Sequence, residues 1–113
     1  MNPQIKQKWV DALRSGDYQQ TKGRLRKEDK FCCLGVLCDL YIKENNVEWE
    51  PSTHYKNAYV FQDMATILPR SVVEWAGVGE GNPLVNDGDS SLAKLNDRGS
   101  TFNEIADLIE EHL

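Results

Sequence analysis

The stretch FCCLGVLCDLY, residues 31–41, constrains the fold of this chain most, because its apolar side chains leave no polar face. Placed on a helix of 3.6 residues per turn, these side chains point in every direction. They belong to Leu34, Val36, Leu37, Cys38, Leu40 and Tyr41. Such a helix is stable in water only when other elements cover it on all sides. The stretch therefore predicts a buried central helix over about residues 33–44.

The two ends of the chain carry helix-capping signals. Asn2 can cap a first helix that Pro3 opens and Gly16 closes. Thr101 with Glu104 forms a capping-box pattern at the start of a final helix. Each cap precedes one apolar stripe, formed by Ile5, Trp9 and Leu13 in the first helix and by Phe102, Ile105, Ala106, Ile109 and Leu113 in the last. We expect these stripes to face the core, although the same two helices can also build a symmetric dimer.

Shorter elements fill the middle of the chain. At Leu68–Pro69 the proline can occupy the first turn of a short helix that runs through Trp75–Ala76 and that Gly77 ends. Ser91 can begin another helix that runs to Asn96. Aromatic and β-branched residues between positions 45 and 66 predict one or two short strands.

Further short strands are predicted at residues 25–26 and 31–32, around a turn at 27–30, and at residues 84–85. No alternation of strands and helices recurs along the chain, which argues against a parallel α/β unit. The sequence therefore predicts a helix-rich α+β fold, with four to five helices around the central one and a small short-stranded β component. At 113 residues we expect a single globular domain over residues 1–113.

The charge is unevenly distributed. The net charge is −5, yet residues 1–30 carry eight basic against four acidic side chains, and residues 31–113 carry five against fourteen. Bulk attraction to nucleic acid or to an anionic membrane is therefore not expected, whereas a local basic surface is. Because no run of 18 apolar residues occurs and residues 1–15 lack the features of a secretory signal, we expect a cytoplasmic protein without a membrane partner.

The cysteines Cys32, Cys33 and Cys38 are predicted to be buried, reduced thiols. Their spacing fits no zinc pattern, and a nucleophilic cysteine would have to rely on His54 as its base. The Asp87–Asp89 loop suggests a cation site but lacks the downstream glutamate of a calcium loop. We therefore assign no metal, no cofactor and no catalytic residue.

The segment LNDRGSTFNEIADLI resembles the start of a helix-turn-helix motif, with a glycine turn and a threonine-capped helix. The given chain ends where a recognition helix would follow, and its last helix carries Glu110 and Glu111. Acidic side chains repel phosphate, so we do not expect nucleic acid to be a partner of this element.

The basic stretch KGRLRK, Lys22 to Lys27, is the strongest candidate for a ligand surface. Lys22, Arg24 and Arg26 lie around Gly23, whose missing side chain allows close approach, and guanidinium groups match phosphate and carboxylate geometry. Arg70 can supply a second cation from the LPR turn. A ring-bearing ligand also needs a stacking partner, for which the sequence offers Trp49, Tyr55 and Tyr59.

Five segments together carry a resemblance to a known family: KWVDALRSG, KGRLR, FCCLGVLCDLY, LPRSVVEWAG and SLAKLNDRGSTFNEIADLI. Over nearly its full length the chain resembles a family of small, uncharacterised proteins of bacteriophages and prophages. The resemblance implies a phage-related origin and a protein that acts in the host cytosol. It assigns no catalytic residue to this chain. By analogy with other small phage proteins, and not from any feature of a site, this resemblance favours an accessory protein used against the host.

These observations lead to three hypotheses. The first is a non-enzymatic phage-type binding protein that sequesters a phosphate-bearing, nucleotide-like ligand or inhibits a host protein, with a counter-defence role. The second is a small enzyme acting on a nucleotide or another phosphorylated substrate, with Asp29 or His54 as its base. The third is a nucleic-acid-binding protein.

Overall fold

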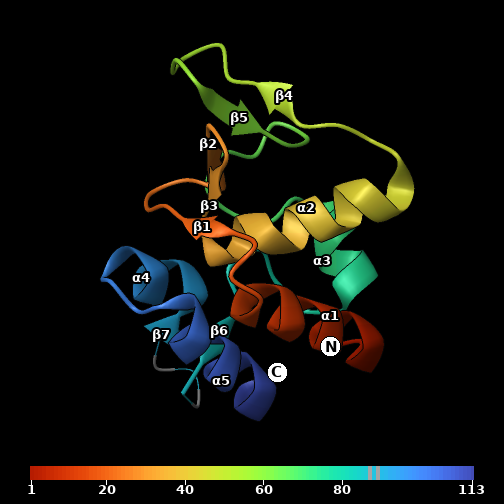
Figure 1. Cartoon of the computed structure of the whole chain (residues 1–113). Coiled ribbons are helices and arrows are strands. Elements are labelled where there is room, and N and C mark those ends of the chain that lie inside the picture. The colour runs from red at the N-terminus through yellow and green to blue at the C-terminus, as the bar shows by residue number, and fades with distance from the viewer. Residues whose placement is uncertain (87, 89) are drawn as a thin grey trace.

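Helix α2 (Cys33–Asn45) runs through the middle of the molecule, as the sequence predicts (Figure 1). The computed structural model describes residues 1–86, 88 and 90–113. Within these residues four more helices surround α2, namely α1 (Pro3–Arg14), α3 (Arg70–Ala76), α4 (Leu92–Asp97) and α5 (Phe102–His112). With its short strands this arrangement confirms the predicted helix-rich α+β class.

Burial of α2 is nearly complete over its first two turns. Every residue from Cys33 to Asp39 is buried, and only the last turn, from Lys43 onward, is exposed. Gly35 lies in direct contact with the backbone of Leu25, because a Cβ atom at this position would stand 1.9 Å from the Leu25 carbonyl oxygen. The central helix and the basic loop are therefore packed backbone against backbone.

A five-stranded sheet lies beside α2 and holds the basic loop. Its strand order is β1-β3-β2-β5-β4, and β1 and β3 form the parallel pair while the other neighbours are antiparallel. The strands are β1 (Gln19–Gln20), β2 (Arg26–Lys27), β3 (Lys30–Phe31), β4 (Glu50–Pro51) and β5 (Ala58–Val60). Figure 1 shows the β4–β5 hairpin projecting from the end of the molecule away from α1 and α5.

The predicted hairpin around residues 27–30 exists, but its strands are shifted by one residue and its turn is tighter. Arg26 pairs with Phe31, whereas Leu25 leaves the ladder because its N–H donates to the Ala65 carbonyl over 2.7 Å. The Leu25 carbonyl in turn accepts the Cys32 N–H over 3.1 Å. Strand β1 was not predicted, because a pair of glutamines has no apolar alternation.

The predicted helix caps at residues 2, 91 and 101 and the predicted strand at residues 84–85 are confirmed. Asn2, Ser91 and Thr101 cap α1, α4 and α5, and Gly77 ends α3 in the left-handed conformation. Pro69 is the N-cap of α3 rather than a member of its first turn. The predicted strand β6 (Leu84–Val85) pairs with β7 (Ser90–Ser91). Asp87 and Asp89, the suggested cation loop, lie outside the described residues.

Helices α1 and α5 pack along each other beneath α2 (Figure 1). Their apolar stripes, with Trp9 and Ile105 fully buried, are therefore used within the chain rather than left for a partner copy. The indole N–H of Trp9 also donates to the Cys33 carbonyl over 3.0 Å, which joins α1 to the start of α2. None of the helices in the described part of the chain is long and apolar enough to cross a membrane.

Replacing Gly35 with alanine tests the contact between α2 and the basic loop. Alanine normally stabilises a helix interior by about 1 kcal/mol relative to glycine, but here the added methyl group would collide with the Leu25 carbonyl. We expect Gly35→Ala to lower the free energy of unfolding by about 1–3 kcal/mol in urea denaturation. The exposed change Glu44→Ala on the same helix is the control and should stay within about 0.5 kcal/mol. A stabilised Gly35→Ala protein would show that the contact is absent in solution.

Candidate functional site

A cavity of about 190 Å³ lies beside Arg24, between the basic loop and the β4–β5 hairpin. The Arg24 guanidinium carbon stands 4.5 Å from the centre of the Tyr55 ring, which is 62% exposed. The polar residues that line the cavity are Arg24, Ser52, Tyr55, Tyr59 and Thr66, and its apolar lining residues are Ala58, Val60 and Ala65. The cavity thus combines one cation, the Tyr55 ring and residues that carry hydroxyl groups.

Two contacts with α4 fix the backbone of the basic loop ahead of Arg24. The Gly23 N–H donates to Asp97 over 2.8 Å, and the positive φ of Gly23, 82°, suits glycine. The amide of the buried Asn96 donates to the Thr21 carbonyl over 2.8 Å and accepts the Cys33 N–H over 3.1 Å. Asn96 therefore ties the loop to the first residue of α2.

Arg26, two residues further, is engaged within the fold. Its Nε donates to the Glu28 carbonyl over 2.7 Å, and its Nη2 pairs with Asp29 over 3.1 Å. Its side chain is only 18% exposed, and its guanidinium carbon lies 4.1 Å from the centre of the Tyr59 ring. The rings of Phe31 and Trp49 lie 5.4 and 5.8 Å away. Arg26 thus holds strands β2, β3 and β5 together.

The structure therefore divides the predicted ligand residues. Arg24 and Tyr55 meet at the cavity, which Tyr59 also lines, whereas Arg26 stands over the rings of Tyr59 and Trp49. Lys22 is exposed and lies on the side of Gly99, and Arg70 pairs with Glu74 on α3 over 2.9 Å. The two bases suggested for an enzyme, Asp29 and His54, do not belong to the described wall of this cavity.

Two polar wall residues, Ser52 and Thr66, were not predicted. Ser52 follows Pro51, and its hydroxyl accepts the N–H groups of His54 and Tyr55 over 3.1 and 3.2 Å. A serine after proline is a recognisable turn signal, so Ser52 was within reach of sequence reasoning as a turn residue. Thr66 has no local signal, because the loop that contains it reaches the cavity only through the Leu25–Ala65 hydrogen bond.

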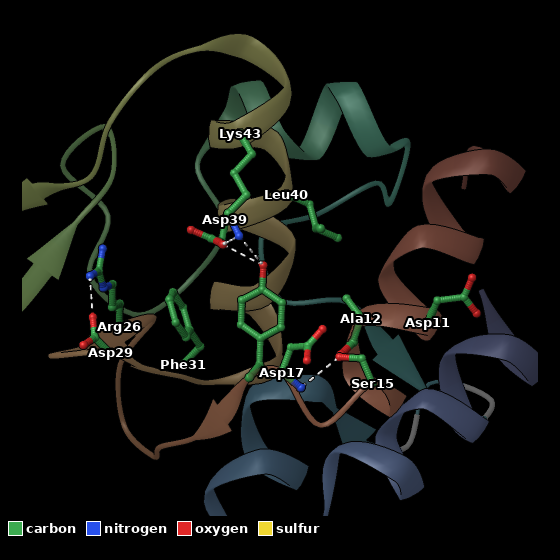
Figure 2. A pocket seen from close by; sticks show the side chains of 11 residues that line it. Asp11, Ala12, Ser15, Asp17, Arg26, Asp29, Phe31, Asp39, Leu40 and Lys43 are labelled. Carbon is green, nitrogen blue, oxygen red and sulfur yellow. Dashed lines mark hydrogen bonds and ion pairs between the residues drawn. The ribbon is translucent and has the colours of Figure 1, made fainter.

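A second, more open cavity of about 650 Å³ lies between α2, the end of α1 and the β2–β3 turn (Figure 2). Asp39 is buried at its edge and accepts hydrogen bonds from Tyr18 over 2.6 Å and from Trp49 over 3.1 Å, while Lys43 pairs with it over 3.0 Å. Burial alone would raise the pKa of Asp39, but these three donors lower it below its ordinary value. Burial and the bond to Asp39 raise the pKa of Tyr18 to about 12. This network is a structural anchor between Tyr18, α2 and Trp49.

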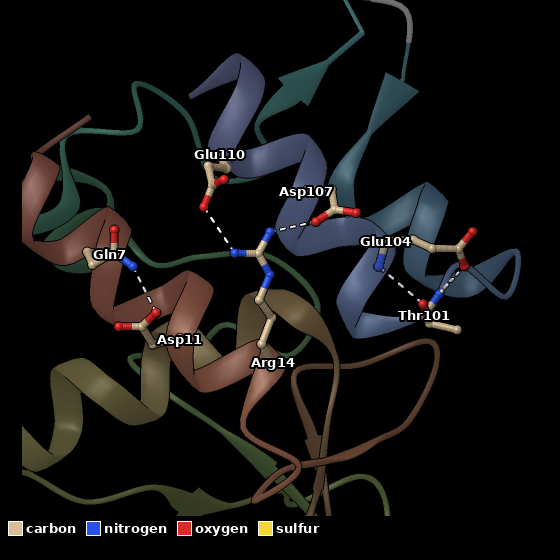
Figure 3. A network of polar contacts seen from close by, with 7 residues as sticks. All are labelled: Gln7, Asp11, Arg14, Thr101, Glu104, Asp107 and Glu110. Carbon is tan, nitrogen blue, oxygen red and sulfur yellow. Dashed lines mark hydrogen bonds and ion pairs between the residues drawn. The ribbon is translucent and has the colours of Figure 1, made fainter.

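The last helix uses part of its acidic face within the chain. Arg14 of α1 pairs with both Asp107 and Glu110 of α5, and the capping box of Thr101 and Glu104 starts that helix (Figure 3). These contacts hold α5 against α1 as a core helix. The threonine cap, one of the two features on which the resemblance to a helix-turn-helix motif rests, is present at the start of this helix.

The three cysteines are buried in the core, as predicted. Burial raises the pKa of the Cys32 thiol to about 11 and the pKa values of Cys33 and Cys38 well above the ordinary value. These thiols therefore stay protonated at neutral pH, which disfavours thiolate chemistry.

Comparison with known proteins gives one family match, to the family described as "Domain of unknown function (DUF8296)", over residues 1–113. No curated protein and no solved structure matches the chain.

The Asp39 network has a pH signature that can be measured. Because folding lowers the pKa of Asp39, its stabilising effect is present above the pKa of an unfolded aspartate, about 3.9, and is lost as the pH falls through the lower folded value. We expect Asp39→Asn to lower the free energy of unfolding by about 1.5–3 kcal/mol at pH 7. The deficit relative to the parent protein should shrink below about pH 4.

The control for this measurement is Asp17→Asn, which removes an exposed carboxylate from the wall of the same cavity. It should change the free energy of unfolding by no more than about 0.5 kcal/mol. An Asp39→Asn deficit that stays constant from pH 7 to pH 3 would contradict the assignment.

Proposed function

We propose that this chain, which belongs to the DUF8296 family, is a non-enzymatic binding protein that holds a small anionic ligand in the cavity beside Arg24. The ligand is phosphate-bearing and nucleotide-like, with its anion on the guanidinium and its ring beside the tyrosines.

The observation that carries this proposal is the state of Arg24. Within the described part of the chain no acidic side chain forms an ion pair with it, whereas Arg26 pairs with Asp29 and Arg70 with Glu74. Its guanidinium is oriented by the Tyr55 ring and stands in the wall of a cavity. A pre-oriented guanidinium can bind a phosphate or carboxylate through two N–H donors without first breaking an internal ion pair.

The composition of the cavity favours retention of the ligand over its conversion. The described wall contains donors and aromatic rings, but no histidine or carboxylate that could remove a proton. Asp29 is already paired with Arg26, and His54 lines a different cavity together with Glu50 and Asp63. We therefore favour sequestration over the alternative of a small enzyme.

The same arrangement gives little support to nucleic-acid binding. A protein that follows a nucleic-acid backbone neutralises several phosphates with a row of basic side chains. The cavity presents one guanidinium, and the protein has a net charge of −5. A single ligand group fits these charges better than a polymer.

The cellular role that we propose rests on the resemblance to small proteins of bacteriophages and prophages. In that setting the protein would act in the host cytosol as an accessory protein, either by removing an anionic signal molecule or by engaging an anionic group on a host protein. Both versions use the Arg24 cavity, and both support a counter-defence role.

The decisive variant is Arg24→Ala, tested by isothermal titration with adenosine monophosphate and its cyclic 3′,5′ form. Loss of one charge-assisted contact, worth about 1.5–3 kcal/mol, should weaken binding by about tenfold to a hundredfold. Lys56→Ala, which removes an exposed cation from the same hairpin but outside the cavity wall, should leave affinity unchanged.

Stability measurements distinguish the role of Arg24 from that of Arg26. Arg24→Ala should keep the melting temperature of the parent protein, whereas Arg26→Ala should lower it because Arg26 joins three strands. Ligand released by heat should be chemically intact, and a converted product would favour the enzyme hypothesis. Equal binding by Arg24→Ala and the parent protein would remove this cavity from consideration.

A further inference from the structure

The wall of the Arg24 cavity carries a single charge. Arg24 is the only ionisable cation or carboxylate that the described residues contribute to it. Among the other basic side chains of the loop, Arg26 is paired with Asp29, Lys22 lies beside Gly99, and Lys27 does not belong to the described wall. A ligand group with one negative charge would be neutralised here, whereas a second charge would enter the wall without a counter-ion. Desolvation of an unpaired charge is costly.

The remaining polar groups suit a singly charged acceptor. The Ser52 hydroxyl oxygen already accepts two backbone N–H groups, so its proton is free to be donated into the cavity. Thr66 and Tyr55, which also carry neutral hydroxyl groups, line the same wall. Neutral donors complete the hydrogen bonding of an anion without adding the positive charge that a dianion requires.

The size of the cavity limits what enters it. At about 190 Å³ it is smaller than the roughly 300 Å³ at which pockets for whole small molecules begin. One group of the ligand can therefore be enclosed while the rest stays at the rim. The rim carries the exposed Tyr55, whose ring stacks against Arg24, and the apolar side chains of Ala58 and Ala65 lie close by. This surface suits a flat ring attached to the enclosed anion.

We infer that the Arg24 cavity selects monoanionic ligands, a phosphodiester or a carboxylate joined to a flat ring, over phosphate monoesters and polyphosphates. This inference rests on the proposed function and adds the charge class of the ligand. The carboxylate and the phosphodiester share one negative charge spread over two oxygens, which one guanidinium can bind in a bidentate manner.

Three ligands that share the adenine ring but differ in charge test the inferred preference for monoanions. Adenosine 3′,5′-cyclic monophosphate carries one negative charge, adenosine monophosphate carries about two, and adenosine triphosphate carries more. We expect titration at constant ionic strength to give the tightest binding for the cyclic diester and about tenfold weaker binding for the triphosphate. Benzoate, a flat monocarboxylate, tests whether a carboxylate rather than a phosphodiester supplies the negative charge that the cavity binds.

A gain-of-charge variant tests the same rule from the protein side. Thr66→Lys places a second cation in the cavity wall and should raise the affinity for adenosine monophosphate relative to the cyclic form by about tenfold. Thr53→Lys is the matched control, because it adds the same charge to the hairpin outside this wall. The control should leave the ratio of the two affinities unchanged.

The outcomes distinguish this inference from the function on which it rests. Binding that depends on Arg24 but is tightest for the triphosphate would overturn the inferred selectivity for monoanions. It would leave the proposed binding function intact. An equal shift in Thr66→Lys and Thr53→Lys would also overturn it, because the effect would then come from net charge. If neither the adenine ligands nor benzoate binds, both proposals fail.

Discussion

Helix α2 has no polar face over its first two turns, and its stability in water depends on complete coverage by the rest of the chain. Helices α1, α3 and α4 and the sheet all lie against it (Figure 1). Coverage is closest at Gly35, where the Leu25 backbone fills the space that a side chain would need. Because the backbone of Leu25 is held in this way, the backbone positions of its neighbours Arg24 and Arg26 are fixed as well. The candidate site is thus a consequence of how the central helix is buried.

The two arginines beside Leu25 have different surroundings. Arg26 stands opposite Phe31 on one neighbouring strand and Tyr59 on the other, where its guanidinium covers a ring and pairs with Asp29. Arg24 precedes the strand, so the ladder does not surround it, and Tyr55 at the hairpin tip is its aromatic partner. Arg26, inside the central strand, packs against rings and pairs with Asp29, whereas Arg24, just before that strand, has no acidic partner among the described residues.

Part of the acidic excess of the chain also has a structural use. Asp39 anchors Tyr18 and Trp49 to α2, and Asp97 holds the backbone of Gly23. Asp107 and Glu110 bind Arg14 and fasten the last helix to the first. The carboxylates that position the basic loop lie outside the described wall of the Arg24 cavity. This separation leaves a local positive charge on a protein whose net charge is −5.

Local physics was sufficient to predict the helices from the sequence. Asn2, Ser91 and Thr101 cap helices through their own side chains, and the all-round apolar stretch could only be a buried helix. For the candidate site, the sequence predicted a basic loop and a set of aromatic residues, but not which of these residues lie together. The choice among them was made by the tertiary structure. Which arginine keeps its charge available depends on strand register and on a hairpin some thirty residues away, and such long-range pairing leaves no periodic pattern in the sequence.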